Sequence, residues 1–246
     1  MKTFSLLILF AVPVAAAPAV SSEHQKAKRW MEEVNHTTNP VRLLFLAMNI
    51  KDSLDKALAL EPENVDIRLD LVRFYTVTPR VLGGSMDDAR AQAVEIARRD
   101  APLGHFALGY IAYREKEFGS ARRELREAVK TAPVESTRKL ALQWLGWLSQ
   151  ESQEYDEAFA AFEELGANYE IGRTAVFCSC RLERAKAALQ ELVKTKPRDA
   201  AGHYQLALVH EKLGELPAAR REIAIAWRLD RTLAGLKEAR KRFGVR

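Results

Sequence analysis

The chain has 246 residues, of which 38 are Lys or Arg and 33 are Asp or Glu, so its formal net charge is +5. Charges of both signs alternate along the chain, which is typical of solvated helix faces and argues against a nucleic-acid-binding protein. Its two cysteines, Cys178 and Cys180, are separated by one residue. Disulfides spread through the chain, which hold small secreted domains together, therefore do not hold this fold.

The first residues have the pattern of a secretory signal peptide. A positive start precedes an apolar run over residues 4–14, and the small residues AAAPAV follow. We expect a signal peptide at residues 1–19 with cleavage after Ala19, or alternatively after Ala16. The alternative of a membrane anchor is disfavoured, because the run is shorter than the roughly 20 residues of a span and two prolines interrupt it. The mature chain is therefore expected to be periplasmic or secreted, with no stable membrane span.

Helical patterns begin directly after this segment. Residues 22–34 and 41–60 are predicted helices, separated by a polar break and ended by Glu61-Pro62. We therefore divide the mature chain into an N-terminal helix with its polar break, 20–40, and a repeat region, 41–246. The next helix is followed by a long loop, TVTPRVLGGSMDDA, in which Ser85 and Asp88 form a predicted capping box.

Three later segments repeat one pattern. Each has Leu before a small residue, a polar turn, and an aromatic residue or Leu. Ala follows three positions later, and a bulky apolar residue comes four positions after it. This pattern predicts helical hairpins with Ala where two helix axes come closest. One hairpin cannot bury its apolar face alone, so several must stack. The Ala positions are Ala121, Ala158 and Ala219, and the apolar positions are Leu125, Phe162 and Ile223.

The pattern resembles the tetratricopeptide repeat (TPR) family over nearly the whole mature chain. The resemblance implies an all-α, TPR-type solenoid of about five to six hairpins, with a C-terminal capping helix over residues 233–243. We expect hairpins at 102–134, 139–165, 166–197 and 200–233. The helix before the hairpin at 166–197 is expected to end early, at Gly166. The loop with proline and Gly-Gly-Ser is similar to that of exported bacterial TPR proteins, which supports a periplasmic location but implies no activity.

In this family the first helix of each hairpin lines the concave groove. Carrying the repeat positions onto this chain places aromatic, Arg and Gln side chains there, a combination typical of peptide-binding surfaces. The alternative is that some of the rings fill the core between hairpins. Paired Lys and Asn, which some members use to clamp a carboxylate, do not occur at these positions. The predicted partner-binding residues are Arg73, Phe106, Tyr110, Tyr113, Arg114, Gln143, Trp147, Gln150 and Tyr204.

No pattern in the chain indicates catalysis. The histidines do not form a metal-binding motif, and no nucleophile motif or paired-carboxylate signature occurs. The Gly83-Gly84-Ser85 turn is better explained as a turn and helix cap than as an anion site. We expect an incidental role for the cysteines, although a redox pair remains an alternative. The chain is thus predicted not to be an enzyme and to need no cofactor or metal.

The sequence therefore predicts an exported protein that binds a protein or peptide as an adaptor or assembly scaffold. An alternative is an envelope-associated structural protein whose basic C-terminal surface contacts anionic lipid or cell-wall polymer. The residues of that basic surface are Lys237, Arg240, Lys241, Arg242 and Arg246.

Overall fold

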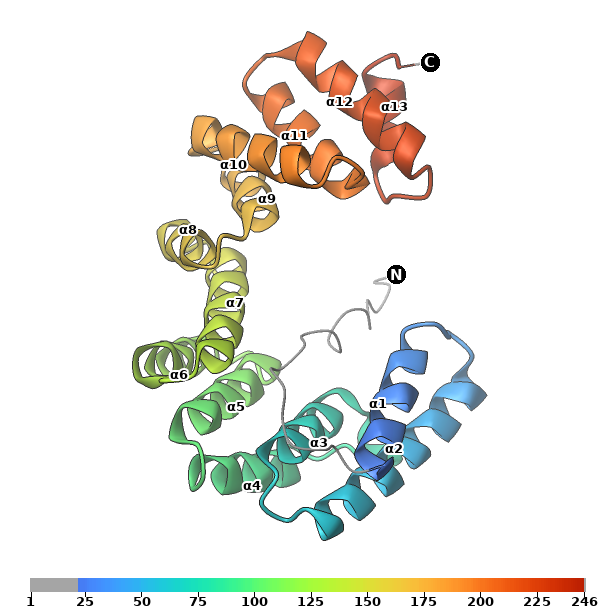
Figure 1. Ribbon diagram of the computed structural model, residues 1–246, viewed down its shortest axis with the longest axis vertical. Coiled ribbons are helices and arrows are strands. Elements are labelled where there is room, and N and C mark those ends of the chain that lie inside the picture. Colours follow the sequence, from blue (N-terminus) through green and yellow to red (C-terminus); the bar gives the residue numbers. More distant parts are fainter. Residues whose placement is uncertain (1–21, 246) are drawn as a thin grey trace. The chain divides into compact units, whose positions relative to one another are not determined.

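The computed structural model describes residues 22–245, and every regular element in this range is helical (Figure 1). The predicted signal peptide, residues 1–19, and Arg246 lie outside the described residues. The helices are α1 (Ser22–Val34), α2 (Pro40–Leu60), α3 (Val65–Val77), the 3-10 helix η1 (Arg80–Leu82), α4 (Met86–Ala97), α5 (Ala101–Arg114), α6 (Phe118–Thr131), α7 (Glu135–Glu151), α8 (Tyr155–Glu164), α9 (Asn168–Cys178), α10 (Leu182–Thr195), α11 (Ala200–Lys212), α12 (Leu216–Leu229) and α13 (Leu236–Arg242).

Successive helices form six pairs, α1/α2 to α11/α12, and α13 follows the last pair. This arrangement confirms the predicted all-α solenoid. Contacts divide the chain into two compact units, unit 1 up to Trp144 and unit 2 from Leu145, and the boundary falls inside α7. Within residues 22–245, no helix combines the length and apolar character that crossing a bilayer requires.

Polar side chains begin several helices by accepting hydrogen bonds from free backbone amides. Asn64 caps α3, and Ser85 caps α4 by accepting from the amide of Asp88 at 3.2 Å. Asp100 and Asp199 do the same for α5 and α11. The bond to Ser85 is one of the two bonds of the predicted capping box, because the Ser85 amide donates to the carbonyl of Tyr75 and not to Asp88. The side chain at each of these positions thus determines where its helix begins.

The Leu-Gly and Ala positions of the repeat are where paired helices touch. Ala121, Ala158 and Ala219 are all 0% exposed, as predicted. A Cβ on Gly146 would lie 2.5 Å from the ring of Phe162, and one on Gly172 would lie 2.4 Å from Leu189. Small residues are therefore required at these positions, because any side chain would push the two helices of a hairpin apart.

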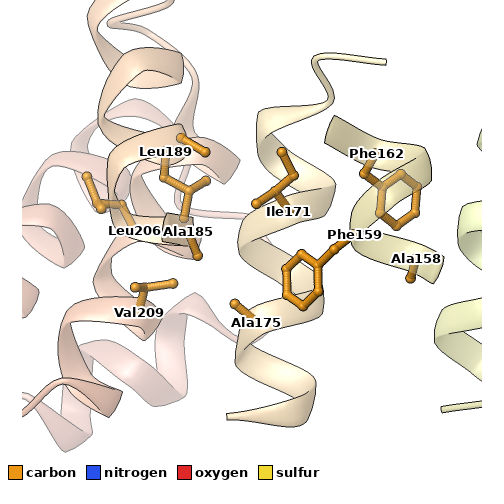
Figure 2. Packing of buried hydrophobic residues seen from close by; sticks show 10 residues of the cluster. Ala158, Phe159, Phe162, Ile171, Ala175, Ala185, Leu189, Leu206 and Val209 are labelled. Carbon is orange, nitrogen blue, oxygen red and sulfur yellow. The ribbon is translucent and has the colours of Figure 1, made fainter. Parts of the chain in front are cut away.

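The core of unit 2 is built from these pairs. Phe159 of α8 faces Ile171 and Ala175 of α9, while α10 and α11 supply Leu189, Leu206 and Val209 from the other side (Figure 2). Phe162 of α8 belongs to the same cluster. The helix α8 is only 10 residues long, against 14 for α6, and Gly166 follows it with φ +62°. This confirms the predicted early stop at Gly166.

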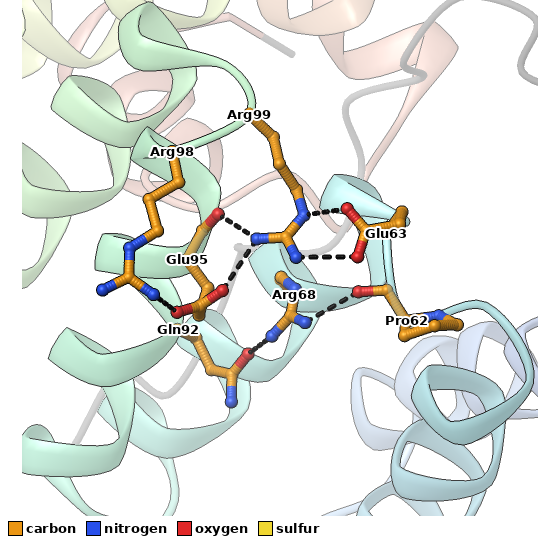
Figure 3. Close-up of polar contacts among 7 residues, drawn as sticks. All are labelled: Pro62, Glu63, Arg68, Gln92, Glu95, Arg98 and Arg99. Atoms are coloured by element: carbon orange, nitrogen blue, oxygen red, sulfur yellow. Dashed lines mark hydrogen bonds and ion pairs between the residues drawn. The ribbon is translucent and has the colours of Figure 1, made fainter.

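A polar network holds the start of α3 against the end of α4 in unit 1 (Figure 3). Arg99 donates to both oxygens of Glu63 at 2.6 and 2.8 Å, and also to Glu95 at 2.7 Å. Arg68, which is nearly buried, donates to Gln92 and to the carbonyl of Pro62. These bonds satisfy charged groups that the packing of the two helices partly removes from water.

The loop before α4 is tightly built. Gly83 has φ +96°, and a Cβ on Gly84 would lie 1.7 Å from the carbonyl oxygen of Thr78. The amide of Gly84 donates to the carbonyl of Pro79, and the amide of Ser85 donates to that of Tyr75. The glycines are thus needed for backbone conformation and for close packing, which agrees with the predicted turn and cap.

The helix α13 closes the C-terminal end of unit 2. Leu236, Ala239 and Phe243 are buried against Ile223 and Ala226 of α12. The predicted helix over residues 233–243 is shorter in the structure, because Gly235 has φ +77° and the helix starts after it.

Cys178 and Cys180 form a disulfide between the end of α9 and the following turn. Their separation is two residues, so the bond links no two hairpins. Ser179, between them, has φ +54°. The fold therefore depends on helix packing and not on this bridge.

Candidate partner-binding surface

The structure separates the predicted partner-binding residues of unit 1 into buried and half-buried side chains. Phe106 and Tyr110 of α5 are each 1% exposed, and their rings stack with centroids 6.5 Å apart. Tyr110 also contacts Trp144 of α7 edge-on at 4.9 Å. These rings therefore fill the core between neighbouring hairpins, which is the alternative that the sequence left open, and they present little surface to a ligand.

Tyr113 and Arg114, in the last turn of α5, are half-buried and reach the surface. Tyr113 packs edge-on against Trp144 with centroids 5.5 Å apart, so its ring is held in place. The Nε of Arg114 is buried and has no hydrogen-bond partner within residues 22–245. An ordered ring next to a guanidinium that reaches the surface is an arrangement that can bind a peptide through both stacking and charge-assisted hydrogen bonds.

The Tyr110 hydroxyl lies at the inner side of this cluster. Burial raises the pKa of Tyr110, while the nearby Thr76 hydroxyl and the charges of Arg114 and Arg73 act in the opposite direction. Both arginines therefore lie near this hydroxyl. Arg73, however, is already paired, because it donates to Asp70 at 3.0 Å. Of the two cations, Arg73 is therefore committed to an ion pair within unit 1.

Asp70 connects Arg73 to the first helix. His24 Nε2 of α1 lies 2.8 Å from Asp70 Oδ2, and both side chains are almost fully buried. Burial alone would raise the pKa of Asp70, but the hydrogen bond from His24 and the charge of Arg73 outweigh it, so the pKa is lowered. This triad is a structural contact that positions Arg73, and no pattern in the sequence indicated it.

In unit 2 the predicted residues also differ in exposure. Trp147 is half-buried and packs against the unit 2 core, whereas Gln150 is 9% exposed and accepts a bond of 3.4 Å from the Thr174 hydroxyl. Phe177, at the end of α9, is 62% exposed with the guanidinium of Arg173 5.7 Å from its ring centroid. Trp147 and Phe177 are therefore two aromatic side chains on first helices of unit 2 that can contact a partner.

The remaining predicted residues are less available. Gln143 of α7 is half-buried in unit 1. Tyr204 of α11 is half-buried at the C-terminal cluster, where a Cβ on Gly235 would lie 2.8 Å from its hydroxyl oxygen. Burial raises the pKa of Tyr204. Tyr204 thus contributes mainly to packing beneath α13.

An exposed apolar stripe on α2 was not predicted. Val41 is 75% exposed, Leu44 42%, Phe45 45% and Met48 65%. Trp30 of α1 packs edge-on against Phe45 at 5.9 Å. The spacing i, i+3, i+4, i+7 was visible in the sequence, but a second stripe on α2 is buried. Helical periodicity alone does not show which stripe the neighbouring helices cover.

The described residues contain no group of three or more His, Cys, Asp or Glu side chains that could hold a metal ion. The titratable clusters instead join helices, as in His105 with Glu124 and His203 with Glu222. These polar groups thus link the two helices of a hairpin.

Comparison with known proteins agrees with this geometry. The tetratricopeptide repeat family matches residues 83–136 and 181–231. The chain contains TPR repeats. The two matched ranges contain α4–α6 and α10–α12 of this TPR protein, so each includes a complete hairpin.

Among solved structures, YrrB, described as a TPR protein with an unusual peptide-binding site, is similar with a TM-score of 0.55 and 12% identity. The match covers 76% of the present TPR protein and 97% of YrrB. MamA matches over 91% of this chain and 98% of its own, with 16% identity and a TM-score of 0.34. No curated protein sequence matches the chain. The likeness to YrrB shows the fold.

Proposed function

We propose that this TPR protein binds a protein or peptide partner through the first helices of its hairpins and acts as an adaptor or assembly scaffold in the periplasm. The observation that carries the proposal is the pair Tyr113 and Arg114 at the end of α5. The ring is held by Trp144, and the Nε of Arg114 has no hydrogen-bond partner within the described residues. Aromatic and Arg side chains dominate the binding energy of protein interfaces.

The fold supports this proposal. YrrB, which has a similar fold, is described as having a peptide-binding site. Stacked helical hairpins present extended surfaces that bind other molecules, and their solenoid needs no catalytic group to do so. In unit 2, Trp147 and Phe177 supply further aromatic surface on first helices.

The experiment that tests the proposal is a capture of partners with three baits. The mature chain, the double variant Tyr113→Ala/Arg114→Gln and the control Arg198→Gln are each incubated with periplasmic extract, and bound proteins are quantified by mass spectrometry. Arg198 is exposed between α10 and α11, so the control removes one charge away from the first-helix surface. A partner of this surface is retained by the control and lost with the double variant.

A titration with the captured partner then measures each side chain. Trp147→Ala is expected to weaken binding by about 2 kcal/mol if this ring is a hot spot. Circular dichroism of each variant is the folding control. Equal recovery of every protein by all three baits contradicts the proposal. If Trp147→Ala unfolds unit 2, this ring belongs to the core and only Tyr113 and Arg114 remain as the proposed contact.

A further inference from the structure

The C-terminal end of unit 2 contains a hollow lined by one aromatic ring, three cations and one aliphatic side chain. The lining residues are Trp227, Lys237, Arg240, Lys241 and Val245. The hollow has a volume of about 510 Å³ and opens to solvent, so it is of the size that holds a small ligand or a ligand headgroup. Its lining comes from α12, from α13 and from Val245, which follows α13.

The walls of this hollow are held in place. The helix α13 is anchored by Leu236, Ala239 and Phe243, which are buried in the C-terminal core cluster. After α13 the chain turns at Gly244, with φ +62°, and the amide of Val245 donates to the carbonyl of Arg240 at 3.1 Å. The packing of α13 and this turn therefore determine the shape of the hollow.

Arg240 is the most ordered of the three cations. Its Nε donates to the carbonyl of Val245 at 3.1 Å, and its guanidinium carbon lies 4.6 Å from the centroid of the Trp227 ring. These two contacts hold the guanidinium plane over the indole. The terminal N–H groups have no acidic partner within residues 22–245, so they can donate to a ligand in the hollow.

Lys237 and Lys241 are the other two cations that line the hollow. They are four residues apart on α13, so they lie on the same face of the helix. Both are exposed, and neither forms an ion pair with any described residue. Many other cations of this chain are paired, for example Arg242 with Glu211 at 2.7 Å.

Nearby acids do not line the hollow. Glu238, on the same helix, lies close enough to Tyr204 that its charge adds to burial in raising the pKa of Tyr204. Glu211 is paired with Arg242. Cations in the last turn also stabilise the helix dipole. The dipole explains basic residues at this end of α13, but not their placement around Trp227.

We propose that this hollow binds a phosphate group. A phosphate monoester carries close to two negative charges and several acceptor oxygens, which match two ammonium groups and one planar guanidinium better than a single carboxylate does. The Trp227 ring forms an apolar wall for the part of the ligand next to the phosphate. The ligand is a phosphate carried either by a lipid headgroup or by a soluble molecule. This inference is independent of partner binding by the first helices.

The test titrates the mature protein with inorganic pyrophosphate at low salt and follows indole fluorescence. The expected result is a saturable change that the variant Trp227→Phe lacks. The double variant Lys237→Gln/Lys241→Gln should lose at least about tenfold in affinity, since two charge-assisted contacts are removed. The control Lys194→Gln/Lys196→Gln, at the end of α10 in the same unit, removes equal charge and should bind like the wild type.

A second arm distinguishes the source of the phosphate. Co-sedimentation is measured with phosphatidylcholine vesicles that contain or lack phosphatidic acid, with and without competing pyrophosphate. Binding only to the phosphatidic acid vesicles, reduced by pyrophosphate, assigns a lipid headgroup, whereas binding of pyrophosphate alone assigns a soluble phosphate. The proposal is overturned if neither probe binds, or if the two double variants lose affinity equally, since binding would then follow net charge. Circular dichroism confirms that each variant is folded.

Discussion

His203 Nδ1 lies 2.6 Å from a carboxylate oxygen of Glu222, and this contact joins the two helices of the sixth hairpin. His105 and Glu124 make the same contact at 2.8 Å in the third hairpin, and both pairs are 19 residues apart. The repeat therefore reproduces a polar link between paired helices as well as their apolar packing.

A double-mutant cycle on each pair measures this link. We expect a coupling of about 1 kcal/mol for His203→Ala and Glu222→Ala, because both side chains are mostly buried. The coupling for His105 and Glu124 should be smaller, since the His105 side chain is 36% exposed and solvent weakens the contact. The measurement is urea unfolding of the four proteins in each cycle. A larger coupling in the exposed pair would contradict this ranking.

Acid should destabilise unit 1 through Asp70. The hydrogen bond from His24 and the charge of Arg73 overcome burial and lower the pKa of this carboxyl. Because the pKa of Asp70 is lower in the folded state than the value of about 3.9 in the unfolded state, its ionised form stabilises the fold at pH values above about 3.9. This contribution is lost as the pH falls through the folded pKa.

The variant Asp70→Asn should therefore lose about 3 kcal/mol near neutral pH, because it breaks a buried charged pair, and should show a weaker dependence on acid. Asp52→Asn, at an exposed ion pair on α2, is the control and should unfold like the wild type. Unfolding followed by circular dichroism at several pH values checks both. An unchanged acid profile for Asp70→Asn would show that this triad does not couple to folding.

The two loop glycines should differ in their tolerance of alanine. Gly84→Ala should be the more damaging, because its Cβ would lie 1.7 Å from the carbonyl oxygen of Thr78 and the backbone must move. Gly83→Ala should cost about 1 kcal/mol, since its φ is +96°. Gly119→Ala on α6, where nothing lies within 4 Å, should be neutral or stabilising. Thermal unfolding ranks the three, and equal melting temperatures for all would mean that the loop is not tightly packed.

Close helix packing should make Ala158 intolerant of a larger side chain. Ala158 is 0% exposed between α8 and its neighbours, so Ala158→Leu overpacks the core at a cost of about 1–3 kcal/mol. Ala160, two residues further along α8, is exposed, and Ala160→Leu should change stability little. The free energy of unfolding in urea compares the two variants. Equal effects would mean that the helices can separate to accept the new side chain.

Export predicts a shortened N-terminus. The exported protein should begin at Val20, or at Ala17 if cleavage follows Ala16, because small residues precede both positions. Mass spectrometry of the protein recovered from a periplasmic fraction measures the start. A product that keeps Met1 and remains with the membrane would instead support an uncleaved anchor.

The hairpins and their closest contacts could be predicted because they depend on local patterns. Leu-Gly at 145–146 and Ala158 lie on the two helices of one hairpin, and small residues at this spacing leave few other packings. Helix starts such as Ser85 were equally visible, because a cap acts over three residues.

Tertiary structure alone decided which aromatic side chains remain accessible. Phe106 and Tyr110 were predicted for the partner surface but are buried, whereas Phe45 was not predicted there and is exposed. A helix inside a stack has neighbours on several sides, so its periodicity does not distinguish the solvent face from the face toward the next hairpin. Tertiary packing also decided the surroundings of Arg114 and Arg240. The neighbours of Arg114 come from packed helices, and those of Arg240 come from α12 and from the chain reversal after α13. Local sequence patterns do not specify either geometry.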